Sequence, residues 1–383
     1  MRGEENVTKV AAEKKRRQAL VPRVWMGDFE RDIQECCLWE RAPDILETLL
    51  IDRTMTAVDP AGRVHRIRWG AEGYGFAVDA EIDPIAISKP MERIIRPRVD
   101  KRIEDQRKRS VDRAEVFTPS WVCNKQNNLV DQAWFGRKTK LFNQEVVDKA
   151  TGQNTWQSTY DPQKQIEFPP NRTWEEYVCA NRLEVACGEA PYLTSRYDTT
   201  TGDPIPVEQR IGFLDRKLRV ISERVGADRK KWLEMAEKAL KSCYGFEWQG
   251  DNVFLARENM LYAVLEAYYW RYNEAKVPLT KQRRFAEIIS WNIWQMDGIK
   301  FVVPNTCHEE ACKKAAAERA QGKFDFGGEA VAEDTASPLM VECLGCRSGE
   351  VARHNGIRCR IMDWEVGKPV LFMPPFDFKP LEC

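Results

Sequence analysis

Cysteine and histidine residues near the C-terminal end have a spacing that suits metal binding. Cys343, Cys346, His354 and Cys359 form the pattern C-x2-C-x7-H-x4-C. Three thiolates and one imidazole can close a tetrahedral site, and glycines between them relax the turns. The pattern predicts a structural zinc ion. The alternative is four unlinked residues in a chain that has 12 cysteines.

A second and weaker cluster precedes this pattern. Cys307, His308 and Cys312 lie close together in the sequence. A cysteine beside a histidine also suits a nucleophile, but no residue that would orient the histidine is evident. His65, far from both clusters, reads as a surface or strand residue.

Acidic residues recur where short apolar runs end. The stretch Leu183–Leu193, LEVACGEAPYL, contains Glu184 and then a small-residue turn at Gly188. Glu247 ends the run YGFEW, and Asp297 follows another apolar run. Glycine lets backbone N–H groups approach a ligand closely, and a carboxylate can accept hydrogen bonds from ligand hydroxyls or cations.

Helical periodicity fills the sequence between these acids, so the acids are expected to lie on strands joined by helices. Apolar residues at helical spacing predict helices over 211–225, 228–243 and 251–269. Earlier, a Phe-Thr-Pro turn precedes a helix rich in Asn and Gln within 115–131. Strand, acid, then helix is the order of a doubly wound α/β sheet that binds its ligand across the carboxyl edge.

Composition limits the other classes. Lys+Arg and Asp+Glu both number 59, so no global field attracts nucleic acid or a membrane. No apolar run is long enough to span a bilayer, and the charged N-terminus lacks a signal peptide's apolar region. Free cysteines then favour a reducing cytoplasm. The basic run 93–113 could neutralise phosphates, although a solvated helix or linker is the simpler interpretation.

The composition shifts divide the chain into four expected parts. They are a charged tail (1–22), an α+β region with a basic linker (23–110), a cofactor-binding core with insertions (111–300) and a C-terminal region with the CCHC cluster (301–383).

The four core segments together resemble the S-adenosylmethionine-binding half of DNA adenine-N6 methyltransferases of the restriction-modification type. The segments are FTP at 117–119, LEVACG at 183–188, GFEWQGDNVFLARENM at 245–260 and NIWQMDGIKF at 292–301. The resemblance covers about residues 115–300 and implies a Rossmann-like methyltransferase core. The C-terminal cluster resembles a zinc knuckle with a lengthened middle loop.

The resemblance implies a role for each matching residue in binding S-adenosyl-L-methionine. Thr118 and Pro119 would border the methionine end of the cofactor, and Glu184 and Gly188 would frame it. Glu247 would accept hydrogen bonds from the ribose hydroxyls. The remaining residues implied at the site are Phe117, Ala186, Trp248 and Asp297, of which Asp297 would accept from the adenine amine.

The chain departs from the family in three ways. Glu184 replaces an aspartate, Glu189 and Ala190 replace Ser-Gly, and two extra helices separate Gly188 from Glu247. The catalytic Asn/Asp-Pro-Pro-Tyr motif is also missing.

Two segments resemble remnants of that motif. Phe324–Gly328 lacks the prolines, whereas Met373 precedes the candidate catalytic residues Pro374, Pro375 and Phe376. In the family the motif accepts hydrogen bonds from the target amine and stacks on the flipped base.

The resemblance therefore implies a DNA methyltransferase-like protein that transfers a methyl group to a base amine. Two alternatives stay open. One is a non-catalytic or split subunit of a restriction-modification system that needs a partner chain. The other is a zinc-containing nucleic-acid-binding module with a vestigial cofactor pocket. All three have DNA as the expected partner and none involves a membrane.

Overall fold

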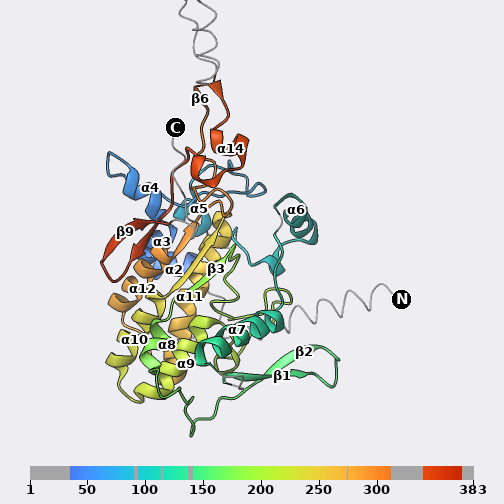
Figure 1. Ribbon diagram of the computed structural model, residues 1–383, viewed down its shortest axis with the longest axis vertical. Helices are drawn as coiled ribbons and strands as arrows, with labels where there is room; N and C mark the ends of the chain where they lie inside the picture. Colours follow the sequence, from blue (N-terminus) through green and yellow to red (C-terminus); the bar gives the residue numbers. More distant parts are fainter. Residues whose placement is uncertain are drawn as a thin grey trace, which may run out of the picture.

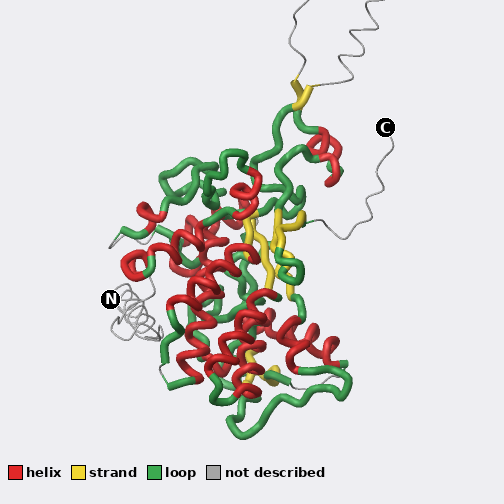
Figure 2. The backbone as a smooth tube through the Cα atoms, turned by 90° about the vertical axis from the view of Figure 1, so that its left-hand side faces the viewer, coloured by secondary structure: helices red, strands yellow, loops and turns green. Residues whose placement is uncertain are grey.

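The computed structural model describes residues 35–89, 94–113, 115–136, 141–273, 275–311 and 340–372. A small parallel sheet lies in the middle of the molecule. Helices α8 to α10 form the lower end in Figure 1, and β6 and α14 lie at the opposite end. Figure 2 shows the same arrangement turned by 90° about the vertical axis.

The helices are α2 (Glu35–Arg41), α3 (Pro43–Leu50), α4 (Arg53–Val58), α5 (Pro84–Ile87), α6 (Ile103–Arg113), α7 (Ser120–Phe135), α8 (Trp174–Cys179), α9 (Phe213–Val225), α10 (Arg229–Lys241), α11 (Gly250–Arg271), α12 (Leu279–Asn292) and α14 (Leu344–Ser348). The strands are β1 (Asn143–Val147), β2 (Asn154–Ser158), β3 (Arg182–Val185), β4 (Cys243–Glu247), β5 (Ile293–Gln295), β6 (Glu310–Ala311), β7 (Met340–Val341), β8 (Arg360–Asp363) and β9 (Lys368–Leu371).

The central sheet has the order β3-β4-β5, and both strand pairs are parallel. Parallel neighbours need helical crossovers, and here each crossover holds two helices: α9 and α10 before β4, then α11 and α12 before β5. The prediction of an α/β fold with a parallel sheet is confirmed, and the helices predicted over 211–225 and 228–243 are present as α9 and α10. The other sheets are two-stranded and antiparallel.

Helix α11 lies at the centre of the core. Its residues are buried from Gly250 to Tyr268, so it is covered on all sides rather than along one stripe. Its buried Arg257 donates hydrogen bonds to the carbonyl oxygens of Leu49 (2.6 Å), Ile51 (3.0 Å), Ser290 (3.1 Å) and Ile293 (2.8 Å). One side chain thus ties the N-terminal helices to α12 and β5.

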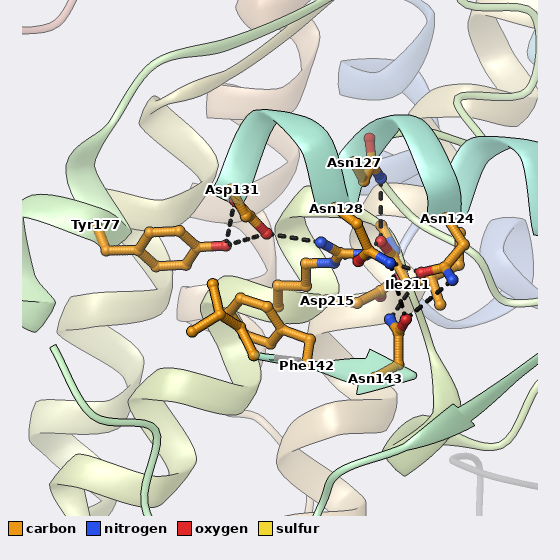
Figure 3. A network of polar contacts seen from close by, with 12 residues as sticks. Asn124, Asn127, Asn128, Asp131, Phe142, Asn143, Tyr177, Ile211 and Asp215 are labelled. Atoms are coloured by element: carbon orange, nitrogen blue, oxygen red, sulfur yellow. Dashed lines mark hydrogen bonds and ion pairs between the residues drawn. The ribbon is translucent and has the colours of Figure 1, made fainter. Parts of the chain in front are cut away.

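The Asn-rich helix α7 is fixed by a buried polar network (Figure 3). Arg216 of α9 pairs with Asp131 at 2.6 Å and donates to the amide oxygens of Asn124 (2.9 Å) and Asn128 (2.8 Å). Asn127 donates to the carbonyl oxygen of Tyr192 at 3.0 Å. The network therefore holds α7, and the Phe-Thr-Pro turn before it, against the chain that follows β3.

The N-terminal region packs into the same hydrophobic core as the sheet. Leu46, Leu49 and Trp69 belong to one buried cluster with residues of α9, α11 and α12. This region was expected to be α+β, but residues 64–69 and 75–78 do not form strands, and isolated bridges at Arg66 and Arg68 are present instead. Part of the reason is the run of positive-φ glycines between them, which turns the chain repeatedly.

A second buried cluster joins the C-terminal region to the sheet. Phe246 of β4 and Trp294 of β5 pack against Cys359 and Phe372 on one sheet face. Strand β3 lies next to the part of the sheet that this cluster covers, and its residues Leu183 and Val185 are 48% and 65% exposed. Within the described ranges β3 is thus an edge strand with apolar side chains facing solvent.

Candidate functional site

Four cysteine and histidine side chains converge in the C-terminal region. The Sγ atoms of Cys307, Cys343 and Cys346 and a ring nitrogen of His354 all lie within 4.8 Å of one another. We call these four residues the Cys/His cluster. His354 Nδ1 is 3.7 Å from Cys307 Sγ, 3.7 Å from Cys343 Sγ and 3.6 Å from Cys346 Sγ.

These three distances match a tetrahedral metal site rather than a set of hydrogen bonds. One imidazole nitrogen either donates one proton or accepts at one lone pair, so it cannot make three hydrogen bonds. In a zinc-centred tetrahedron with Zn–S of about 2.3 Å and Zn–N of about 2.0 Å, sulfur and nitrogen lie about 3.5 Å apart. The cluster can therefore hold a metal ion at its centre.

Local sequence explains how the ligands approach so closely. Cys343 caps the N-terminus of the short helix α14, which carries Cys346. A Cβ on Gly345 would lie 2.4 Å from the backbone nitrogen of His354, and one on Gly356 would lie 3.1 Å from Cys307 Sγ. The two glycines are thus required for space and not for a positive φ.

The electrostatics suit metal ligation. Burial lowers the pKa of His354, and Lys300 and Arg358 lower it further, which favours the neutral imidazole that binds metals. Burial opposes ionisation of Cys343, but hydrogen bonds from the backbone of Asn355 and Cys346 lower its pKa. Lys300 also donates to Cys346 Sγ at 3.3 Å, which offsets the negative charge of the thiolates.

Cys359, predicted as the fourth ligand, lies elsewhere. It is fully buried beside Phe246 and Trp294, and its thiol contacts the carbonyl oxygen of Gln295 at 3.6 Å. Cys359 immediately precedes β8, and its backbone pairs with Phe372 on the sheet side. The correction is that Cys307, from the weaker cluster, completes the set; Cys312 is outside the described residues.

The loop after β3 has an unusual backbone. Ala186, Gly188 and Ala190 all have positive φ, at 49°, 52° and 63°. The two alanines carry a conformational cost of about 1–2 kcal/mol each, and such strain concentrates at ligand sites. Gly188 turns its N–H toward the neighbouring strand and donates to Glu247 Oε2 at 2.9 Å.

The two strand-end glutamates are buried and bind backbone N–H groups. Glu184 accepts from Tyr192 (3.3 Å) and Leu193 (3.1 Å), and burial raises its pKa to about 8. Glu247 accepts from Gly188 and also from Trp248 (2.8 Å), and burial raises its pKa too. Glu184 thus anchors the chain after the loop, whereas Glu247 faces the loop itself.

The Phe-Thr-Pro segment borders the same loop. A Cβ on Gly188 would lie 3.3 Å from the ring of Phe117. Thr118 accepts a hydrogen bond from the hydroxyl of Thr199 through its backbone oxygen at 3.2 Å, and Pro119 caps α7. The structure therefore brings Phe117, Gly188 and Glu247 together at this loop.

Asp297 faces a different neighbour. Its Oδ1 accepts from the backbone of Ile299 (2.9 Å) and Lys300 (3.0 Å). It lines a cavity of about 330 Å³ together with Lys300 and the cysteines of the Cys/His cluster. Asp297 thus lies at the end of β5, but between the sheet and the Cys/His cluster.

A buried charged network beside Glu247 was missed by sequence reasoning. Asp251, at the start of α11, pairs with Lys101 (2.9 Å) and Arg109 (3.0 Å), and Arg109 also binds Glu115 at 2.5 Å. Burial opposes ionisation of Asp251, but Lys101 and Arg109 hold its pKa below the usual range. Two members of the basic run 93–113 thus form internal ion pairs. The sequence signal that could have indicated this network is Asp251, the acid in the first helical turn after YGFEW.

Several buried polar atoms of this region have no partner among the described residues. They are Arg98 Nε, Glu115 Oε1, Trp248 Nε1, Gln249 Oε1 and Asn252 Oδ1. Buried polar groups are normally hydrogen-bonded, so this set is suited to receive water or a polar ligand.

The candidate catalytic residues Pro374, Pro375 and Phe376 lie outside the described residues, as does Phe324–Gly328. The strand that leads toward them, β9, pairs antiparallel with β8 rather than with the parallel sheet.

No protein-family model matches the chain, and no curated protein or solved structure is significantly similar to it. None of the helices in the described ranges has the length and apolar character needed to cross a membrane.

Proposed function

We propose that this chain binds S-adenosylmethionine at the loop after β3, as the cofactor-binding part of a DNA methyltransferase-like protein. The observation that supports this most is the contact between Gly188 and Glu247 at the carboxyl ends of adjacent parallel strands. Ligands of open α/β sheets bind at this edge. Phe117 supplies an apolar wall beside it.

The residues present fit a nucleoside cofactor with a charged tail. The Glu247 carboxylate has two oxygens with about four acceptor positions, so its backbone contacts leave capacity for a ribose hydroxyl. The unpartnered polar atoms of Trp248, Gln249 and Asn252 lie on the neighbouring stretch. When bound, the cofactor supplies an electrophilic methyl group for an in-line attack by a base amine such as adenine N6. The protein contributes by positioning the two reactants.

Calorimetry with S-adenosylmethionine tests the proposal. The wild-type chain should bind it, and Glu247→Gln should bind at least about tenfold more weakly because a charged hydrogen-bond acceptor is worth about 1.5–3 kcal/mol. Glu234→Gln, on the exposed side of α10, is the matched control and should bind as the wild type does. Absence of binding to the wild-type chain would refute the proposal.

The exposed edge of β3 favours a second candidate: a subunit whose sheet is completed by a partner chain. Doubly wound sheets continue on both sides of their first strand, whereas the described residues place no strand on the outer side of β3. Transfer of a labelled methyl group to DNA by the purified chain separates the two candidates. Cofactor binding without transfer would favour the subunit.

We further infer that the metal in the Cys/His cluster is zinc in a structural role. Three thiolates and one imidazole close the tetrahedron, so no position remains open for a reacting water. Metal analysis of the purified chain should give about one zinc per chain. A value near zero in protein purified without chelator would contradict this assignment.

A further inference from the structure

The turn that carries Asp297 lies between the sheet and the Cys/His cluster. We call residues 297–302, which follow β5, the Asp297 turn. Asp297 and Val302 form an antiparallel bridge, and Val302 forms a second one with Arg358. The side chain of Asp297 closes the turn by accepting from two backbone N–H groups within it.

Two long basic side chains join this turn to the metal ligands. Lys300 donates to Cys346 Sγ at 3.3 Å. Arg358 donates to the backbone oxygen of Lys300 at 3.0 Å and to that of His354 at 3.4 Å. A shift of either ligand would therefore be passed directly to the turn.

A third connection runs through the backbone on the other side of the cluster. Val303, next to the turn, donates to the carbonyl oxygen of Ile357 at 2.8 Å and accepts from the Thr306 hydroxyl at 2.7 Å. Thr306 precedes Cys307 directly, and its hydroxyl also accepts from the Ile357 backbone at 3.0 Å. The turn is thus linked to Cys307, Cys346 and His354 by separate contacts.

We propose that a metal ion in the Cys/His cluster fixes the Asp297 turn, and thereby fixes the end of β5 beside the proposed cofactor site, where the Met296 backbone donates to the Glu247 backbone oxygen at 2.9 Å. Without the ion, no disulfide joins Cys307 to Cys343, and holding them together across the long stretch of chain between them costs conformational entropy. The Asp297 turn is then no longer supported through Cys346 and Cys307. The role in cofactor binding rests on the proposed function, but the ordering of the turn does not.

Hydrogen exchange measured by mass spectrometry tests the first part. The full chain is compared as purified, after zinc removal with a chelator under reducing conditions, and after zinc is restored. Peptides that cover 296–303 should exchange at least about tenfold faster without zinc and recover with it, whereas peptides of α11 should not change. Equal exchange of 296–303 in both states would overturn the proposal.

A milder variant avoids the risk that metal removal disturbs the whole C-terminal region. Lys300→Gln removes one connection and leaves all four ligands, so it should speed exchange of 296–303 while zinc content stays near one. Lys368→Gln, an exposed lysine on β9, is the control. Equal exchange in the Lys300 variant and the control would count against the coupling.

Calorimetry separates this inference from the proposed function. Zinc-free protein should bind S-adenosylmethionine at least about tenfold more weakly than zinc-loaded protein, a difference of about 1.4 kcal/mol. Equal affinities would overturn the coupling to the cofactor site. If zinc-loaded protein does not bind the cofactor, the proposed function fails, and hydrogen exchange alone then decides whether zinc orders the turn.

Discussion

The identity of the fourth ligand of the Cys/His cluster gives the sharpest test. We predict that Cys307→Ser loses zinc and that Cys359→Ser keeps it, although sequence spacing predicts the reverse. Structural zinc sites contribute about 10–16 kcal/mol of binding free energy. Shared among four ligands, this is about 2.5–4 kcal/mol for each, so losing Cys307 should weaken zinc binding by at least about fiftyfold.

The assay is competition with a chromophoric chelator, together with the zinc-to-protein ratio after gel filtration. Wild type, Cys359→Ser and the exposed control Cys179→Ser should each retain about one zinc. Cys359→Ser should instead lower the free energy of unfolding, because it places a hydroxyl beside Phe246 and Trp294. Zinc lost from Cys359→Ser but kept by Cys307→Ser would refute the assignment.

Three further predictions concern buried or crowded residues. Because burial raises the pKa of Glu184 to about 8, the folded state keeps a proton that the unfolded state has already released above about pH 4.5. The free energy of unfolding should therefore fall between about pH 4.5 and pH 8, by up to about 5 kcal/mol. Denaturant melts of Glu184→Gln at several pH values should lack this part of the pH dependence. Lys217 is fully buried and donates to the carbonyl oxygens of Ala180 (2.7 Å) and Ser242 (3.3 Å), so Lys217→Met should cost about 2–4 kcal/mol in urea unfolding while the exposed Lys238→Met costs little. Gly345→Ala should weaken zinc binding in the chelator assay because its Cβ would displace the histidine ligand; Gly349→Ala, which has a positive φ but open space around it, should change stability without changing zinc affinity.

The parallel sheet was predictable because its signals are local. Each strand is a short apolar run, and the helix that follows has its own periodicity, so Glu184 and Glu247 could be placed at strand ends from neighbouring residues alone. The contact between Gly188 and Glu247 follows from the fact that parallel neighbours end at the same edge.

The Cys/His cluster shows where local sequence signals fail. Cys343, Cys346 and His354 lie close in sequence, so their spacing constrains their geometry. Cys307 is distant in sequence, and contacts of the chain on both sides of it, from Thr306 to Ile357 and from His308 to Asn355, hold it at the cluster. Cys359 has a spacing that suits a ligand, but its side chain packs on the apolar face of the sheet instead.

The charged network beside Glu247 could not be predicted because charge runs normally lie in solvent. Lys101 and Arg109 belong to a strongly basic stretch, yet both form ion pairs with the buried carboxylate of Asp251. The sequence does not show which charges of such a run are paired, since the partner lies far along the chain. Exposed members of the run, such as Lys108, keep the surface position first expected.

The burial of Arg257 has a consequence for how the molecule unfolds. Its guanidinium donates hydrogen bonds to carbonyl oxygens of the N-terminal helical region, of α12 and of β5. If the helices before residue 89 came away, the buried cation would lose two of its acceptors, which is costly in a dry interior. The N-terminal region and the sheet should therefore melt in a single cooperative transition, and a shortened chain that lacks the first helices should not be an independently stable core.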